Sequence, residues 1–148
     1  MTPRAAADWV ALHGNAVISD TLRPVDIAHS PREAVITPKI GTPDWSTGVV
    51  HFALPNAPNG STKPSRLLVD FQTVMAIAKK VEIYFGPSEV FQLSLTDEYN
   101  LEDLDVSSIS ASVVQPGKCG HGISLSITLW FQQPSSKVSI ESVGLIFR

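Results

Sequence analysis

The chain has 148 residues, the length of one average domain, and we expect a single folded unit over residues 1–148. Hydrophobic residues make up 43% of the sequence and charged residues 17%, a balance that excludes wholesale disorder. The formal net charge is −3 and the basic residues are scattered, which argues against a nucleic-acid backbone as partner.

The sequence holds no run of about 18 apolar residues, so we expect no membrane-spanning helix and no membrane partner. The segment from Met1 to Asp8 lacks the apolar stretch of a secretory signal, which predicts a cytoplasmic protein. The single cysteine, Cys119, has no partner for an internal disulfide, in agreement with a reducing compartment.

Short segments of alternating apolar and polar residues, interrupted by 11 prolines and 9 glycines, predict a mostly β chain. In chain order, we expect strands at residues 15–19, 34–37, 49–54, 67–72, 80–85, 89–95, 107–114, 122–132 and 137–147. A helical turn or two is expected at residues 96–104, where Thr96 or Asp97 can cap the first turn.

The clearest of these strands covers residues 122–132, in which apolar and polar side chains alternate throughout. The strands at 67–72 and 80–85 show the same alternation, and we interpret them as neighbours in one sheet. The sequence Gly86-Pro87-Ser88 between two predicted strands indicates a hairpin turn.

In the last predicted strand, the apolar side chains change parity between Ile140 and Val143, which predicts a β-bulge near Ser142. About eight or nine strands are enough for two packed sheets, so we expect an all-β fold, an antiparallel β-sandwich of jelly-roll type. The alternative is a closed, calycin-like β-barrel, because alternation does not distinguish one closed sheet from two packed sheets.

Two motifs stand in the first third of the chain: Trp9 followed by His13-Gly14-Asn15-Ala16, and Trp45 followed by His51-Phe52-Ala53-Leu54-Pro55. With these motifs the chain resembles a family of small all-β proteins of unassigned function. Members of that family carry a Trp, then His-Gly-Asn-Ala, and later a Trp before His-Phe-Ala-(Ile or Leu)-Pro. The resemblance implies the β-sandwich fold and assigns no activity.

In its length and its lack of familiar enzyme motifs, the chain also resembles the small cofactor-free hetero-Diels-Alderases of fungal tropolone sesquiterpenoid pathways. That resemblance implies an activity, pericyclic ring closure without a cofactor. It transfers no catalytic residue.

Three polar residues of the motifs are candidates for catalysis. His13 and Asn15 fall at a turn into a strand, where Gly14 permits a positive φ, and their side chains can converge on a substrate oxygen. The alternative is that both cap local backbone groups. His51 alternates with two apolar neighbours, so it is either a proton donor on the face away from the core or a solvated histidine.

The segment 115–122 holds three glycines and places Lys118, Cys119 and His121 close together in the chain. We expect it to act as a mobile lid whose Lys118 and His121 contact the substrate. A thiol nucleophile formed by Cys119 and His121 is the alternative, although such a pair needs a third group to orient it. The scattered histidines and the single cysteine lack the spacing of zinc ligands.

Residues 97–105 contain five carboxylates, a density that hard cations favour. The spacing of a calcium-binding loop is absent, so we expect a solvated acidic turn, with weak Ca²⁺ binding as the alternative. We therefore expect no metal site.

Aromatic and polar side chains share the strand face opposite the apolar stripe: Trp130, Tyr84, Asp70, Gln72 and Glu82. If their strands are adjacent, they form a platform on which flat ligands, including sugars, can stack. The alternatives are an ordinary outer sheet or a homodimer interface, since outward aromatic residues are common in both.

No nucleotide-binding loop, dinucleotide fingerprint or Gly-x-Ser-x-Gly motif is present, which argues against phosphoryl, redox and serine-hydrolase chemistry. We expect a cofactor-independent cyclase or pericyclase of secondary metabolism that acts on a bulky apolar intermediate and uses no cofactor. His51 or His13 is the expected donor to a substrate oxygen, and Asn15 an orienting donor.

Trp9, Trp45 and Trp130 are the expected walls on which the apolar small-molecule partner stacks. The alternative function is a lectin-like module without catalysis. In this module Trp45, Tyr84 and Trp130 stack sugar faces, and Asp70, Gln72 and Glu82 bind hydroxyl groups. The outward aromatic residues also allow a homodimer.

Overall fold

The structure, a computed structural model, describes residues 8–55, 64–95, 102–109 and 122–147. Within these ranges the chain forms two antiparallel sheets. The 6-stranded sheet contains β1 (Asp8–His13), β3 (Val25–His29), β4 (Ala34–Pro38), β6 (Pro64–Val74), β9 (Leu104–Asp105) and β11 (Lys137–Phe147). The 5-stranded sheet contains β2 (Ile18–Ser19), β5 (Thr47–Leu54), β7 (Ala76–Phe85), β8 (Ser88–Ser94) and β10 (Ile123–Phe131).

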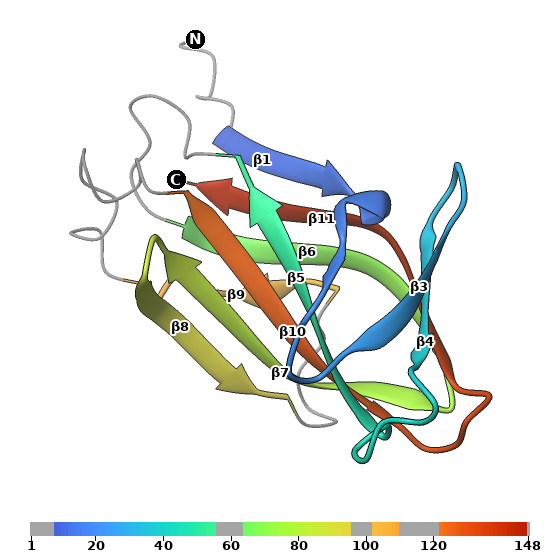
Figure 1. The fold of residues 1–148 in the computed structure, drawn as a ribbon. Helices are drawn as coiled ribbons and strands as arrows, with labels where there is room; N and C mark the ends of the chain where they lie inside the picture. The colour runs from blue at the N-terminus through green and yellow to red at the C-terminus, as the bar shows by residue number, and fades with distance from the viewer. Residues whose placement is uncertain (1–7, 56–63, 96–101, 110–121, 148) are drawn as a thin grey trace, which may run out of the picture.

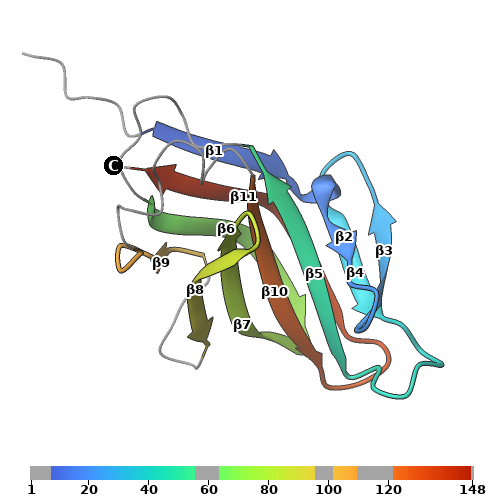
Figure 2. The ribbon, with the colours of Figure 1, turned by 60° about the vertical axis from the view of Figure 1, so that its left-hand side comes forward.

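The two sheets lie as two layers, with β1, β11 and β6 in one and β5, β10 and β7 in the other (Figure 1). Figure 2 shows the second layer lying over the first. Among the described residues the two sheets share no strand pairing, so the expected sandwich is confirmed and the closed-barrel alternative is wrong. Consecutive strands repeatedly cross from one layer to the other, as in jelly rolls.

The core lies between the layers and is built from the alternation that the sequence predicts. In β10, every apolar side chain at an odd position is buried to 2% exposure or less: Ile123, Leu125, Ile127, Leu129 and Phe131. The apolar side chains of β11 also face inward, but on two different parities. Burial of these side chains is the main force that holds the layers together.

The β-bulge predicted near Ser142 is confirmed. In the pairing of β11 with β6, Ile140 lies opposite Phe71 and Ser142 lies opposite Asp70, so Glu141 has no partner on β6. The extra residue shifts the parity, which allows apolar side chains on both sides of it to reach the core.

The interpretation of the strands at 67–72 and 80–85 as sheet neighbours is wrong. They belong to β6 and β7, which lie in different sheets although Met75 alone separates them. Met75 has a φ of 53°, and at this residue the chain passes from the six-stranded sheet into the five-stranded sheet. Strands that switch sheets at a sharp bend are a known way to make the corner of a sandwich. The hairpin at Gly86-Pro87-Ser88 is confirmed, because β7 and β8 pair across it.

Two predicted elements fall partly outside the described residues. The strand at 107–114 is wrong for residues 107–109, which form a turn, and residues 110–114 lie outside the description. The helical turn at 96–104 does not reach Leu104, which belongs to β9, and residues 96–101 lie outside the described residues.

The predicted strand at 15–19 begins later than expected. A 3-10 turn, η1 (Gly14–Ala16), comes first, and the strand β2 covers only Ile18 and Ser19.

The sequence pattern missed β1, β3 and β9. In β3 only Val25 is buried, so its alternation is weak, and β9 has only two residues. No helix in the described ranges is long and apolar enough to span a lipid bilayer.

Candidate functional site

The candidate residues divide between the two outer faces of the sandwich. Trp9, His13 and Asp70 lie on the outer face of the six-stranded sheet, which we call the β11 face. Their chain neighbours Val10 and Val69 are buried, so the alternation of the strand directs the candidate side chains outward.

His51, Tyr84 and Trp130 lie on the outer face of the five-stranded sheet, which we call the β10 face. In the register of β10 and β7, Tyr84 is level with Ser124 and Trp130 is level with Ile77, so the two aromatic residues lie near opposite ends of β10. The platform that the sequence suggests is therefore divided between two faces. Its residues could share one face only if β6 and β7 were neighbours, and these strands lie in different sheets.

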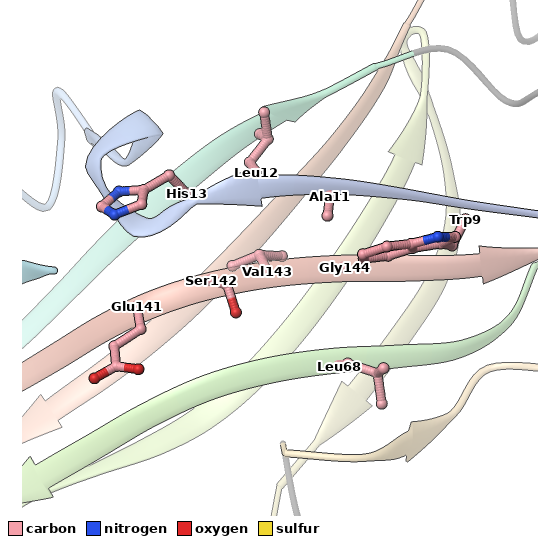
Figure 3. Close-up of a pocket in the computed structure, with 9 residues that line it drawn as sticks. All are labelled: Trp9, Ala11, Leu12, His13, Leu68, Glu141, Ser142, Val143 and Gly144. Carbon is pink, nitrogen blue, oxygen red and sulfur yellow. The ribbon is translucent and has the colours of Figure 1, made fainter. Parts of the chain in front are cut away.

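A groove of about 380 Å³ opens on the β11 face (Figure 3). Its volume lies within the range of small-molecule sites. The groove follows β1 and β11 and reaches β6. Its lining consists of Trp9, Ala11, Leu12, His13, Leu68, Glu141, Ser142, Val143 and Gly144.

Gly144 forms a flat floor in the groove because it has no side chain. A Cβ atom built on Gly144 would lie 3.8 Å from Cε3 of Trp9 and 3.9 Å from the Cβ atom of Ala11. The indole ring thus lies directly beside the glycine, as Figure 3 shows, and Trp9 remains 63% exposed. Leu68 of β6 completes an apolar surface that suits a flat ligand.

The other end of the groove is polar. His13, Ser142 and Asp70 stand in one row across β1, β11 and β6, because Ser142 pairs with both of the others. The bulge adds Glu141, whose side chain points to the same side of β11 as that of Ser142 (Figure 3). Bulges commonly redirect a side chain in this way beside functional sites. We call these four residues the polar row.

The tautomer of His13 is fixed by a local hydrogen bond. The backbone N–H of Asn15 donates to Nδ1 of His13 at 3.0 Å, so the neutral ring carries its proton on Nε2. None of the described residues makes a hydrogen bond to Nε2. This N–H group is therefore available as a donor at the polar end of the groove.

Gly14 holds the turn η1 against β11. Its backbone does not use the positive φ that glycine permits. Glycine is needed for another reason: a Cβ atom here would overlap the carbonyl oxygen of Ile140, directly before the bulge. This close approach keeps His13 and Glu141 at the same end of the groove.

The side chain of Asn15 is directed to the β3–β4 hairpin. Its Nδ2 donates to the carbonyl oxygen of Ser30 at 2.5 Å, and its Oδ1 lies 3.1 Å from Nδ1 of His29. The Asn15 side chain is therefore not a local cap. The local capping that the sequence left open is made by His13, whose side chain caps η1 by accepting from the backbone N–H of Asn15. Asn15 orients His13 through its backbone N–H.

A second polar cluster lies on the β10 face. Nε2–H of His51 donates to Oδ1 of Asp20 at 2.6 Å, and Oγ–H of Ser126 donates to Nδ1 of His51 at 2.7 Å. The carboxylate can only accept, so it determines which ring nitrogen carries the proton. Asp20 also accepts from the backbone N–H groups of Leu22 and Arg23, at 2.9 and 2.8 Å.

An acid, a histidine and a serine stand in the same order in a nucleophilic triad, where Nδ1 of the histidine binds the carboxylate and Nε2 binds the serine. In the Asp20–His51–Ser126 cluster the two ring nitrogens have exchanged these partners. However, both ring nitrogens of His51 are engaged, Ser126 is only 6% exposed, and neither residue lines the groove. The hydrogen bond from His51 holds the pKa of Asp20 below its ordinary value, although burial opposes this shift. These contacts join the segment after β2 to β5 and β10.

Tyr84 belongs to a hydrogen-bonded group of its own. Its hydroxyl donates to Oε2 of Glu82 at 2.7 Å, which raises the pKa of Tyr84 to about 12. Burial favours protonated Glu82, but hydrogen bonds from Tyr84 and Glu89 and the charge of Lys80 hold its pKa below the ordinary value. The hydrogen bond to Glu82 raises the pKa of Glu89 above its ordinary value.

The remaining candidates lie apart from the groove. The ring centroid of Trp130 is 5.5 Å from Nζ of Lys79, a cation–π contact within the sheet. Trp45 is partly buried and packs against the core. Lys118, Cys119 and His121 lie outside the described residues.

The acidic segment 97–105 is described only from residue 102 onward. There, Asp103 forms an ion pair with Arg66 of β6, with Oδ1 and Nε 2.5 Å apart. In the part of the chain that the structure describes, no group of three His, Cys, Asp or Glu side chains could hold a metal ion.

Sequence reasoning missed Leu68, Glu141, Ser142 and Gly144 as groove residues. The parity change at Ser142 was the available signal, because it predicted the bulge that redirects Glu141. Nothing in the sequence marks Leu68 or Gly144, since their role depends on which strands pair.

The fold and the groove define a β-sandwich with a groove of about 380 Å³ on one outer face. No protein-family model matches the chain, and no curated protein matches its sequence.

Proposed function

We propose that the protein is a cofactor-independent cyclase or pericyclase that binds a bulky apolar intermediate of secondary metabolism in the groove of the β11 face. The observation that carries the proposal is the place of His13. Its tautomer is fixed, and it stands at the polar end of a groove whose other end is formed by Trp9 and Gly144. One donor beside an apolar surface matches a flat substrate with one reacting oxygen.

This chemistry needs no nucleophile, because the pose of the substrate supplies most of the catalysis. Holding two reacting groups in a near-attack geometry contributes about 7–11 kcal/mol. One hydrogen bond to an oxygen that gains negative charge adds about 3–4 kcal/mol. In the proposed mechanism, Trp9 and the Gly144 floor hold the pose, and Nε2–H of His13 donates to the oxygen. The hydroxyl group of Ser142, which lies opposite His13 in the polar row, is a second hydrogen-bond donor.

The test uses a panel of aromatic compounds that carry a tethered hetero-diene and alkene and close to a racemic product in buffer. NMR selects the members that shift the indole N–H signal of Trp9, and chiral chromatography measures the rate and enantiomeric excess of ring closure. For a selected member, we expect faster closure and an excess of one enantiomer. A racemic product at the buffer rate from every selected member would overturn the proposal.

Substitutions in the groove separate binding from catalysis. We expect His13→Ala to lower the rate of ring closure about 10²–10³-fold with little change in binding, as when a donor to a developing oxyanion is removed. His13→Gln keeps an N–H donor and should retain part of the rate. Trp9→Ala should weaken binding, while Trp9→Phe keeps an aromatic face. Full activity in His13→Ala would exclude the donor role.

A carbohydrate-binding module without catalysis is the alternative function. The observation that favours it is the 63% exposure of Trp9 on a sheet face, since exposed indole rings can stack on sugars. Glycan-array binding that Trp9→Ala abolishes, together with no ring closure by any groove-binding compound, would favour this module over the cyclase.

A further inference from the structure

Carboxylates concentrate at the polar end of the groove. Glu141 lines the groove at the bulge, and Asp70 lies opposite Ser142 on β6. Side chains directly opposite each other on paired strands have Cβ atoms about 4.5–5.5 Å apart, which places Asp70 at the rim. Asp70 is exposed, and within the described residues its side chain has no ion-pair partner.

The cations near the groove already have partners. Nη2 of Arg32 lies 3.7 Å from Oε1 of Glu141, but the Arg32 side chain is 86% exposed, so solvent screens this pair strongly. Arg66 is level with Ile146 and Trp9, at the opposite end of the groove, and is paired with Asp103. The polar end therefore offers two carboxylates against one weakly held guanidinium group.

The spacing between the two ends limits the shape of the ligand. The row of Ala11, Gly144 and Leu68 forms the centre of the apolar surface, and the polar row is two residues further along the strands. Two residues of a strand span about 7 Å. This is close to the reach from the centre of an aromatic ring to a charged group on a short alkyl chain.

We propose that the intermediate bound in the groove carries an arylalkylamine unit, with its ring on Trp9 and the Gly144 floor and its ammonium group beside Asp70 and Glu141. The inference rests on the proposed function, since it takes the groove as the substrate site and names the substrate class. The carboxylates attract an ammonium group and repel a ligand that carries a carboxylate.

The test compares three indoles that differ only in the end group of a short chain: tryptamine, tryptophol and indole-3-propionate. Calorimetry gives their affinities for the full chain, and NMR reports the indole signal of Trp9. We expect tryptamine to bind about fivefold more tightly than tryptophol, the upper range for an exposed ion pair, and indole-3-propionate to bind most weakly. Salt at about 0.5 M should reduce these differences.

Asp70→Asn should reduce the preference for tryptamine over tryptophol, and the double substitution Asp70→Asn with Glu141→Gln should abolish it, while the affinity for tryptophol stays unchanged. The matched control is Asp44→Asn, which removes one exposed carboxylate from the loop before β5 and should preserve the preference. Equal affinities for the three indoles, tighter binding of indole-3-propionate, or a preference that the double substitution leaves intact would overturn the inference while the groove stands. If no indole shifts the Trp9 signal, the inference fails, and the ring-closure panel decides the proposed function separately.

Discussion

Met75 is the residue at which the chain bends from β6 into β7, and it adopts a left-handed φ of 53°. Its carbonyl oxygen accepts from the backbone N–H of Gln132 at 2.9 Å and from Oγ–H of Ser136 at 2.5 Å. Ser136 is fully buried, so these hydrogen bonds hold the bend in place. A left-handed conformation costs a residue with a Cβ atom about 1–2 kcal/mol.

We expect Met75→Gly to raise the free energy of unfolding by about 1 kcal/mol, because glycine adopts this φ without the steric cost. The side chain that is lost is 48% exposed and contributes little burial. Urea unfolding measures the change. Met75→Ala keeps the Cβ atom and is the matched control. Equal stability of the glycine and alanine variants would show that the left-handed bend stores no strain.

At the scale of elements, the Asp20–His51–Ser126 cluster anchors the short strand β2. The pairing of β2 with β5 involves only Ile18 and Ser19. The cluster adds side-chain hydrogen bonds to β5 and β10, and Asp20 also caps the turn that follows β2. Removing one partner of such a buried or half-buried hydrogen bond costs about 1–3 kcal/mol.

The lowered pKa of Asp20, caused chiefly by the hydrogen bond from His51, makes this anchor dependent on pH. A carboxyl group with a lowered pKa stabilises the fold above its unfolded value of about 3.8 and loses that contribution as the pH falls through the folded value. We therefore expect acid to reduce the stability of the wild type more than that of Asp20→Asn. Urea unfolding from neutral pH to about pH 2 measures both. Parallel stability curves would contradict this assignment.

At the scale of the whole molecule, the range of each interaction decides what the sequence can predict. Alternation is local, so it predicted β10, β11 and the bulge at Ser142. The pairing of strands is not local. The single residue Met75 moves the chain into the other sheet, and the alternation on either side of it is unchanged.

The candidate site also depends on strand pairing between distant parts of the chain. Residue chemistry singled out Trp9, His13 and Asp70, but only the register of β1, β11 and β6 shows that they share one face. Gly144 gains its role from the indole beside it, a contact between residues far apart in the chain. His51 has the same chemistry as His13, and its hydrogen-bond partners lie on strands and turns that the sequence does not connect to it.

The packed core separates the β11 face from the β10 face, so we expect substitutions on the two faces to act independently. Packed sheets lie about 10 Å apart, and effects at sites that share no partner usually add within about 0.3–0.5 kcal/mol. Trp9→Ala and His51→Gln should therefore change the free energy of unfolding additively.

His51→Gln should also leave tryptamine binding and ring closure as in the wild type, whereas His13→Ala should not. A folded His51→Gln variant that loses ring closure would move the catalytic donor to the β10 face, because no described contact of His51 reaches the groove.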